Sequence, residues 1–222
     1  MSHLLILAGP SAVGKTTVME HMLRMRSDLI PIRSMTTRPR RSEGEDEYLH
    51  VDDAAFARAV TQGELLEHTT YGAYRYGTPK SEIARAEAMG KAPLLILELS
   101  GVRSIKEGTY AKTAVAVYLY DELSVMEHRL YERELAQRPS EAARTVFERR
   151  REANRRDYAS MPSHAALFDL FIKNREPQDT ARSILAAFDR IVRGDTVMPE
   201  DEKAAITQAL AAGAPEKENY RA

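Results

Sequence analysis

The chain has 222 residues, a formal net charge of −1, and 43% hydrophobic and 29% charged residues. This composition supports a folded core but gives no overall basic field of the kind found in nucleic-acid-binding proteins. There is no cysteine, which excludes disulfides, thiolate metal sites and a cysteine nucleophile.

The N-terminal residues predict a strand, a loop and a helix. Residues 4–8 (LLILA) form a short apolar run, typical of a strand buried on both faces of a parallel sheet. Residues 9–16 (GPSAVGKT) fit the pattern G-x-x-x-x-G-K-[ST] at every fixed position. Residues 16–26 then carry apolar side chains at helical spacing. This order is the context in which the pattern forms a phosphate-binding loop, or P-loop.

The chemistry of such a loop indicates a nucleoside triphosphate. Its glycines let backbone N–H groups face phosphate oxygens, and the following helix N-terminus adds partial positive charge. Lys15 can reach the β- and γ-phosphates, and the Thr16 hydroxyl can ligate Mg²⁺. The alternative is a glycine-containing turn with an exposed lysine, which the flanking strand and helix disfavour.

The rest of the chain continues the α/β pattern with two exceptions. Apolar runs at 93–99, 113–120 and 167–172 and helical stretches at 78–92 and 176–194 predict a three-layer α/β fold with a central parallel sheet. Residues 33–78 are polar and turn-rich, which favours a small lobe with antiparallel strands. Residues 121–160 are a long charged helical stretch interrupted at AQRPSE. A last helix is expected at 200–212, before a disordered end.

Residues 34–48 (SMTTRPRRSEGEDEY) gather Arg38, Arg40 and Arg41 ahead of four acidic residues. Pairing with these neighbours explains the cluster poorly, because exposed ion pairs contribute only about 0–1 kcal/mol. A nucleic-acid site would need an aromatic platform or a wider basic surface. The phosphate of a mononucleotide is the third option, since arginine binds phosphate through two N–H groups.

From residue 4 to about residue 193, the ordered motifs resemble those of the guanylate kinase family. GPSAVGKTT is similar to the family P-loop, and SMTTRPRR to its S-x-T-T-R-x-x-R. DEY is similar to its D-Y, and GELLEH to its G-E-F-L-E. YGT and FDLFIKN complete the set. These matches place Ser34, Arg38, Arg41, Tyr48, Glu67, Tyr76, Thr78 and Asn174.

The resemblance implies a kinase that transfers the γ-phosphoryl of ATP to GMP or dGMP with Mg²⁺. It implies a P-loop kinase fold with a core (1–32, 79–120 and 161–193), a nucleotide-monophosphate-binding lobe (33–78) and a helical lid (121–160). Residues 194–222 would be a C-terminal extension, partly helical and then disordered. We expect a cytoplasmic protein, monomeric or homodimeric, with neither nucleic acid nor membrane as a partner.

The resemblance also implies site residues. ATP would be bound by Gly9, Ser11, Ala12, Val13, Gly14, Lys15, Thr16, Thr17 and Asn174. The phosphate of GMP would be held by Arg38, Arg41, Tyr48 and Tyr76. Its base would be read by Glu67, which accepts from the guanine N1–H and N2–H₂ groups, with Thr78, Ser34 and Glu98 nearby. Arg40 lies outside the motif and is expected to be a paired or solvated surface arginine.

Catalysis would fall to Lys15 and to arginines of the lid, which neutralise charge as two anionic groups meet. Arg133 and Arg149 resemble the lid arginines of the family. This stretch is longer than the family pattern, so Arg129, Arg138 and Arg144 are alternatives. Most other charges here are expected to form a solvated, salt-bridged helical hairpin.

Four departures from the family pattern bear on specificity. Ala12 replaces a glycine, the chain is about two residues short between Arg41 and Tyr48, and about one residue is added between Gly72 and Tyr76. The family's D-I-D-x-Q-G appears as ELSG, in which Glu98 supplies one carboxylate, near Mg²⁺ or the base, and Ser100 leaves the other unfilled. A different acceptor therefore stays an alternative. A non-catalytic guanylate kinase-like binding module is a second, against which Lys15 and Thr16 argue.

Overall fold

The computed structural model describes residues 3–40, 48–136 and 139–213. It divides into two compact units, which are described separately. Unit 1 comprises residues 1–7 and 19–115, and unit 2 comprises residues 8–18 and 116–222. The division runs through β1 (Leu4–Ala8), α1 (Lys15–Met25) and β8 (Ala114–Tyr120).

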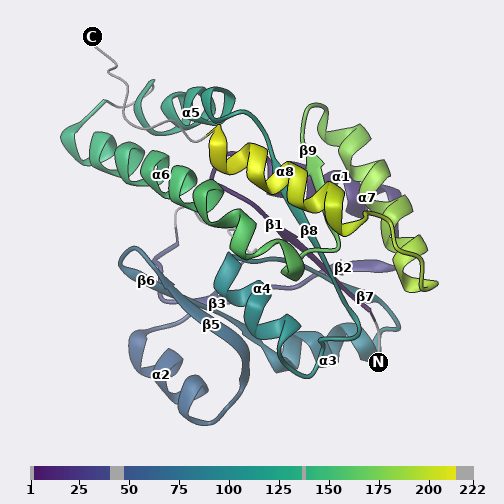
Figure 1. The fold of residues 1–222 in the computed structure, drawn as a ribbon. Coiled ribbons are helices and arrows are strands. Elements are labelled where there is room, and N and C mark those ends of the chain that lie inside the picture. The colour runs from purple at the N-terminus through teal and green to yellow at the C-terminus, as the bar shows by residue number, and fades with distance from the viewer. Residues whose placement is uncertain (1–2, 41–47, 137–138, 214–222) are drawn as a thin grey trace. The chain divides into compact units, whose positions relative to one another are not determined.

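The remaining elements are as follows. Unit 1 holds β2 (Leu29–Pro31), β3 (Ser34–Thr36), β4 (Tyr48–His50), α2 (Asp53–Thr61), β5 (Leu65–Tyr71), β6 (Tyr74–Pro79), α3 (Lys80–Ala88), β7 (Ala92–Ile96) and α4 (Leu99–Lys106) (Figure 1). Unit 2 holds α5 (Leu123–Tyr131), the π-helix η1 (Glu132–Ala136), α6 (Glu141–Ser160), the 3₁₀ turns η2 (Met161–Ser163) and η3 (Ala165–Leu167), β9 (Leu170–Lys173), α7 (Pro177–Val192) and α8 (Glu200–Ala212).

The larger sheet has the strand order β2-β7-β1-β8-β9. The pairs β1–β7, β2–β7 and β8–β9 are parallel. Residues Leu4 to Leu7 of β1 are fully buried, as expected for a strand covered on both faces. The prediction of an α/β fold around a central parallel sheet is confirmed.

The smaller sheet of unit 1 has the order β4-β3-β6-β5. Strands β3–β6 and β5–β6 pair antiparallel as predicted, whereas β3 and β4 pair parallel. Helix α2, which the sequence reading did not anticipate, begins after Asp52, whose side chain accepts a hydrogen bond from the Ala55 N–H. Phe56 on this helix packs with Leu65 of β5, and α2 lies beside the small sheet in Figure 1.

Unit 2 has an aromatic core at the start of β9. The rings of Tyr118, Phe168 and Phe171 contact one another with centroids 5.1–5.4 Å apart. Strand β9 begins three residues later than the predicted 167–172, because η3 precedes it. Asp169 lies between the two and accepts a hydrogen bond from the Ala116 N–H through Oδ2, which holds this turn against β8.

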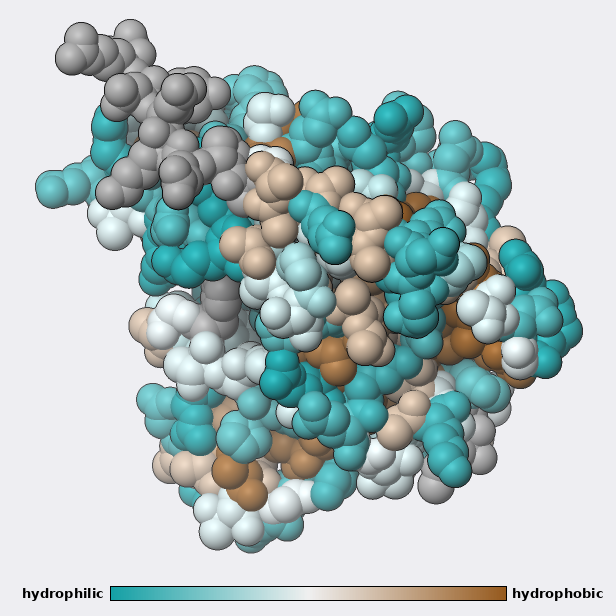
Figure 2. Space-filling view, in the orientation of Figure 1, coloured by the Kyte–Doolittle hydropathy of each residue, from teal (hydrophilic) through white to brown (hydrophobic). Residues whose placement is uncertain are grey.

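Helix α8 occupies the residues predicted for it and packs on α6, η2 and β9. Figure 2 shows apolar side chains gathered over α8, where Ala204, Ala205 and Ala209 are exposed. Its opposite side is buried through Thr207 and Leu210. None of the helices in the described ranges has the length and apolar content needed to cross a membrane.

Candidate functional site

The P-loop adopts left-handed backbone conformations at three positions. Gly9 has φ +142°, Ala12 +64° and Gly14 +98°. A Cβ atom on Gly9 would lie 2.3 Å from the Leu119 carbonyl oxygen, and one on Gly14 would lie 2.5 Å from Asn174 Nδ2. The glycines of the motif are therefore required by both conformation and space.

Lys15 begins helix α1 and folds back over the loop. Its Nζ donates to the carbonyl oxygens of Gly9, at 2.6 Å, and Pro10, at 3.0 Å. Thr16 and Thr17 follow in the first turn of α1 and are exposed, whereas Val13 is fully buried. The loop thus presents an ammonium group, two hydroxyls and a helix N-terminus together, the set of donors that binds phosphate.

Ala12 is the position at which the loop departs from the usual glycine, and it carries conformational strain. Among the described residues it is the one non-glycine with positive φ, a conformation that costs an L-residue roughly 1–2 kcal/mol. Arg129 Nη1 donates to the Ala12 carbonyl at 3.5 Å and pairs with Asp121 at 3.3 Å. Ala12 therefore keeps a left-handed conformation that glycine would adopt more easily.

Two asparagine side chains hold the loop from within unit 2. Asn174, at the end of β9, donates from Nδ2 to the Val13 carbonyl at 2.7 Å and is 1% exposed. Asn154, on α6, accepts from the Ser11 N–H at 2.8 Å and donates to the Ser11 carbonyl at 3.0 Å. Sequence reasoning selected Asn174 but missed Asn154, because nothing local in a charged helix marks a contact 143 residues away.

Asp121 is a second residue that sequence reasoning missed. It follows β8 directly, is 6% exposed and pairs with Arg129. Its N–H and carbonyl group both bond to the Tyr158 hydroxyl of α6. A polar residue at the carboxyl end of a buried parallel strand was the available signal, since ligands gather at that edge of α/β sheets.

The predicted lid arginines take different environments. Arg133 Nε donates to Glu134 Oε1 at 2.9 Å, and Arg150 Nε lies 3.6 Å from the same oxygen. Arg149 is exposed, as is Arg144. Of these candidates within the described ranges, Arg129 alone contacts the P-loop, at the Ala12 carbonyl oxygen. Arg138 lies outside the described residues.

On the small sheet of unit 1, the strand register gathers five of the predicted acceptor residues. Ser34 pairs with Tyr48, Glu67 with Thr78, and Thr36 and Thr69 each with Tyr76. Because side chains alternate along a strand and paired residues share a face, these side chains all lie on one face, called here the acceptor face. Met35, Gly77 and His68 pair on the opposite face.

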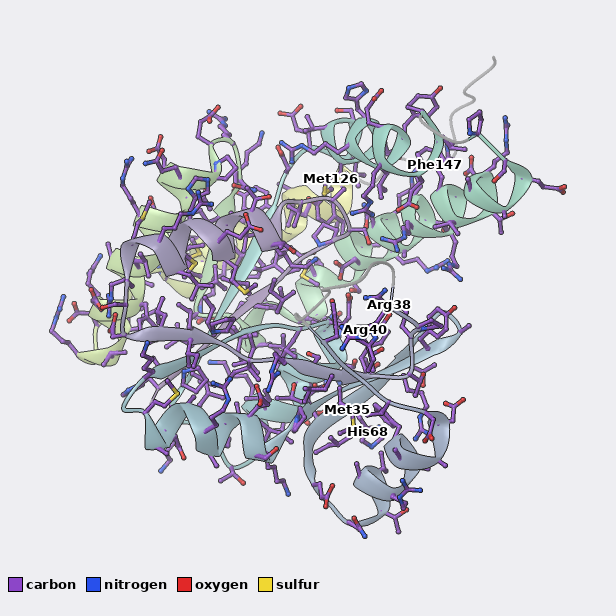
Figure 3. The ribbon with its side chains drawn as sticks, turned by 180° about the vertical axis from the view of Figure 1, so that it is seen from behind. Met35, Arg38, Arg40, His68, Met126 and Phe147 are labelled. Atoms are coloured by element: carbon purple, nitrogen blue, oxygen red, sulfur yellow. The ribbon has the colours of Figure 1, made fainter. Side chains whose placement is uncertain are left out.

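One end of the acceptor face combines an arginine and two tyrosines. The Arg38 guanidinium lies over the Tyr48 ring, 5.1 Å from its centroid, and the rings of Tyr48 and Tyr76 meet edge to face at 6.2 Å. Figure 3 shows Arg38 and Arg40 on the segment after β3. Arg38 is buried and Arg40 is exposed. Arg41 lies outside the described residues.

The other end of the acceptor face holds a buried carboxylate. Glu67 is 7% exposed and accepts a hydrogen bond from Thr78 Oγ1 at 2.7 Å. Burial raises the pKa of Glu67, although the hydrogen bonds from Thr78 act in the opposite direction. No lysine or arginine of the described ranges forms an ion pair with it. An anionic acceptor without a cation beside it suits a ligand edge that offers N–H donors.

The first turn of α4 lies against this end of the face. A Cβ atom on Gly101 would lie 2.8 Å from Glu67 Oε2. Any larger residue at position 101 would therefore displace the Glu67 carboxylate from its observed position. Ser100 Oγ donates to Thr69 Oγ1 at 3.1 Å, and Glu98 is exposed at the N-cap of α4. Ser100 is therefore a neighbour of the acceptor face, whereas no described contact joins Glu98 to it.

The exposed Thr16 hydroxyl at the start of α1 is a group that fits Mg²⁺ carried by a triphosphate, since Mg²⁺ in such sites is shared with substrate phosphates. Within the described ranges, no three histidine, aspartate or glutamate side chains gather into a metal-binding group.

Comparison with known proteins gives consistent matches. The family model described as guanylate kinase matches residues 1–191. Guanylate kinase of Streptomyces coelicolor is 33% identical over 189 residues, covering 82% of this chain and 88% of that protein. Guanylate kinase of Leifsonia xyli is 45% identical over 107 residues, which span 47% of this chain and less than half (42%) of that protein.

A solved structure supports the fold. The crystal structure of guanylate kinase from Anaplasma phagocytophilum superposes with a TM-score of 0.62 at 20% identity and covers 97% of both chains. At this identity the likeness concerns the fold alone, which is that of a P-loop kinase. With a family model that matches residues 1–191 and a Streptomyces relative aligned along most of both chains, the chain belongs to the guanylate kinase family.

Proposed function

We propose that this protein transfers the γ-phosphoryl group of ATP to GMP, forming ADP and GDP. The observation that carries the proposal is the buried Glu67 carboxylate paired with Thr78, in a chain whose P-loop retains Lys15 and Thr16. Glu67 accepts from the N1–H and N2–H₂ groups of guanine. Adenine would present an acceptor nitrogen to the same carboxylate, leaving buried polar groups unpaired.

The acceptor phosphate binds at the arginine and tyrosine end of the acceptor face. Arg38 supplies charge-assisted hydrogen bonds, and Tyr48 and Tyr76 supply neutral ones. Arg41 is proposed for the same role from its place in the motif. Ser34 and Thr78 serve the remaining polar groups of the base. In this assignment residues 33–78 form the monophosphate-binding lobe of the protein.

The donor is ATP with its Mg²⁺, bound at the P-loop. The Thr16 hydroxyl would hold the Mg²⁺ that accompanies ATP, and this ion would supply charge neutralisation on the triphosphate. Backbone N–H groups of residues 12–17 and the Lys15 ammonium bind the β- and γ-phosphates, for which Lys15 leaves the carbonyl groups it now contacts. Asn174 holds the loop through the Val13 carbonyl.

In the transfer step, an oxygen of the GMP phosphate attacks the γ-phosphorus as the bond to the β–γ bridging oxygen breaks, and ADP leaves with the electron pair. Positioning and charge neutralisation carry this chemistry. Residues 121–160 act as the lid. Arg129 is its first contributor because it already contacts the P-loop, and Arg133 reaches the phosphates after leaving Glu134. Arg150 lies near the same carboxylate and is an alternative to Arg149 as the second lid arginine.

The test is ADP formation from Mg²⁺ and ATP with GMP, dGMP, AMP, CMP and UMP offered separately. Turnover with GMP and dGMP alone supports the proposal. Turnover with another monophosphate would keep a P-loop kinase and assign its specificity to the altered region around Glu98 and Ser100. ATP binding without turnover of any acceptor would indicate a binding module.

A further inference from the structure

The Asn154 side chain joins α6 to the P-loop by two hydrogen bonds. Its Oδ1 accepts from the Ser11 N–H at 2.8 Å, and its Nδ2 donates to the Ser11 carbonyl at 3.0 Å. The residue is 2% exposed. Both backbone groups of Ser11 are thus committed to one amide, so the Ser11 N–H does not face the space that phosphates would occupy.

The contact sits beside the strained residue of the loop. Ser11 precedes Ala12, whose φ is +64°. A non-glycine residue keeps such a conformation only where its surroundings enforce it. Asn154 fixes the peptide groups on the N-terminal side of Ala12, and Arg129 Nη1 lies 3.5 Å from the Ala12 carbonyl on its other side. The strain is therefore held by two side chains from outside the loop.

Two further residues lie on the face of α6 that carries Asn154. Arg150 and Tyr158 lie one turn before and one turn after Asn154, and side chains four residues apart share a helix face. The Tyr158 hydroxyl bonds to the backbone of Asp121. The C-terminal part of α6 is therefore anchored at two points within unit 2, and Arg150 extends from the same stripe.

We propose that Asn154 is a positioning residue that holds the Ser11–Ala12 segment in the conformation that binds the triphosphate. This inference deepens the function proposed above, because it assigns a residue to the donor site. Asn154 itself does not contact the substrate. Its loss releases Ser11, lets the strained Ala12 relax, and turns loop N–H groups away from the phosphates.

The experiment measures the binding of ATP and of GMP separately by calorimetry in the presence of Mg²⁺. Asn154→Leu removes both hydrogen bonds at similar side-chain volume, and Asn154→Ala removes them without the risk of overpacking. Glu152→Gln is the matched control, since Glu152 lies on the exposed face of the same helix. We expect about a tenfold rise in the ATP dissociation constant, an unchanged GMP constant, and no effect of Glu152→Gln.

A rescue experiment separates positioning from a general loss of folding. With glycine at position 12 the left-handed conformation carries little strain. Adding Ala12→Gly to either Asn154 variant should therefore restore part of the ATP affinity, whereas a variant that is only destabilised would gain none. Thermal melting of each variant shows whether it is folded at the assay temperature.

Wild-type ATP affinity in a folded Asn154 variant would overturn the inference. An equal loss of ATP and GMP binding without rescue would do so as well, because it would indicate a purely structural role. The readout is independent of the acceptor. If the wild-type protein failed to phosphorylate GMP but its Asn154 variants lost ATP affinity, the proposed function would fail and the positioning role would stand.

Discussion

The proposed donor site and the proposed acceptor site are built in different ways. In unit 2 the P-loop is one continuous segment whose backbone N–H groups would bind phosphate, and Asn154 and Asn174 hold it through their side-chain amides. In unit 1 the acceptor face is made of side chains from four strands that the sheet register brings to one side. A loop of this kind depends more on backbone conformation than on side-chain identity, and Ala12 adopts a positive φ although it is not a glycine. The acceptor face depends on the chemical identity of each side chain.

The two sites also differ in charge. The P-loop offers a cation, Lys15, which contacts backbone carbonyl oxygens. The acceptor face offers a buried anion, Glu67, with a hydroxyl as its hydrogen-bond partner. Substitutions that remove one charge at a time should therefore affect one substrate at a time, and the predictions below follow from that difference.

The largest effect is expected at Lys15. Lys15→Met removes the cation that stabilises charge on the transferring phosphoryl group, so kcat should fall by about 10³-fold. Steady-state assays of ADP formation at saturating GMP measure this directly. Lys112→Met, at an exposed lysine, is the control and should leave kcat unchanged. A Lys15 variant that retained a tenth of the activity would remove the P-loop lysine from the mechanism.

The second effect is at Glu67. Glu67→Gln places an amide N–H or a less basic oxygen against the guanine edge, so the KM for GMP should rise about 100-fold, with the KM for MgATP unchanged. Varying each substrate in turn gives both constants. Glu64→Gln, at an exposed residue just before the same strand, is the matched control. An equal rise in both KM values would contradict a role restricted to the acceptor.

The third effect is the pH dependence of GMP binding. Burial raises the pKa of Glu67 above its ordinary value of 4.5, so the carboxylate takes up a proton at a higher pH than an exposed glutamate does. Protonation removes an acceptor that guanine needs. The KM for GMP should then rise about tenfold per pH unit below the raised pKa, and this dependence should vanish in Glu67→Gln. A KM that stays constant down to pH 4.5 would contradict the assignment.

The smallest effect concerns stability, at a buried glutamate of unit 1 with the opposite pKa shift. Burial alone would raise the pKa of Glu82, but hydrogen bonds from Arg33 and Arg85 outweigh it and lower the pKa to about 2. Since the folded pKa is depressed, this stabilisation is present above pH 4.5 and lost as pH falls toward 2. Glu82→Gln should cost about 2 kcal/mol, less than a fully buried pair because both arginines are partly exposed.

Urea unfolding of Glu82→Gln and wild type at pH 7 and pH 3 measures that effect. The difference between the two proteins should shrink at the lower pH. A difference that stayed the same size would show that Glu82 stabilises unit 1 by packing rather than by charge. In either case the KM for GMP should not change, which separates this carboxylate from Glu67.

The P-loop could be predicted from the sequence because its geometry restricts the residue types. Gly9 and Gly14 stand where a Cβ atom would clash, so the requirement is visible as a pattern. The strands of the large sheet could be predicted for a similar reason, because burial on both faces requires a run of apolar residues. The proposed acceptor residues were selected only through their resemblance to a family, because a single tyrosine or glutamate on a strand has no distinctive local pattern.

The features that could not be predicted depend on contacts between distant segments. Two such contacts are the hydrogen bonds between Asn154 and Ser11 and the ion pair between Asp121 and Arg129. Neither has a local sequence signal. Helix α2 lies in a polar segment whose short apolar pieces suggested strands. The helix is stabilised by the packing of Phe56 against Leu65, a contact between two elements. Arg149 was chosen by motif spacing and stays a prediction. Which of Arg149 and Arg150 shares a helix face with Asn154 depends on the helical phase of α6, which motif spacing does not give.

The measurement that tests the central claim most directly is the separate titration of ATP and GMP into wild type, Lys15→Met and Glu67→Gln. If the donor loop and the acceptor face are separate sites, each substitution should weaken the binding of one nucleotide only. Lys15→Met should weaken ATP binding at least about tenfold and spare GMP, and Glu67→Gln should weaken GMP binding at least about tenfold and spare ATP. GMP binding that Glu67→Gln leaves intact, or one substitution that weakens both nucleotides equally, would contradict it.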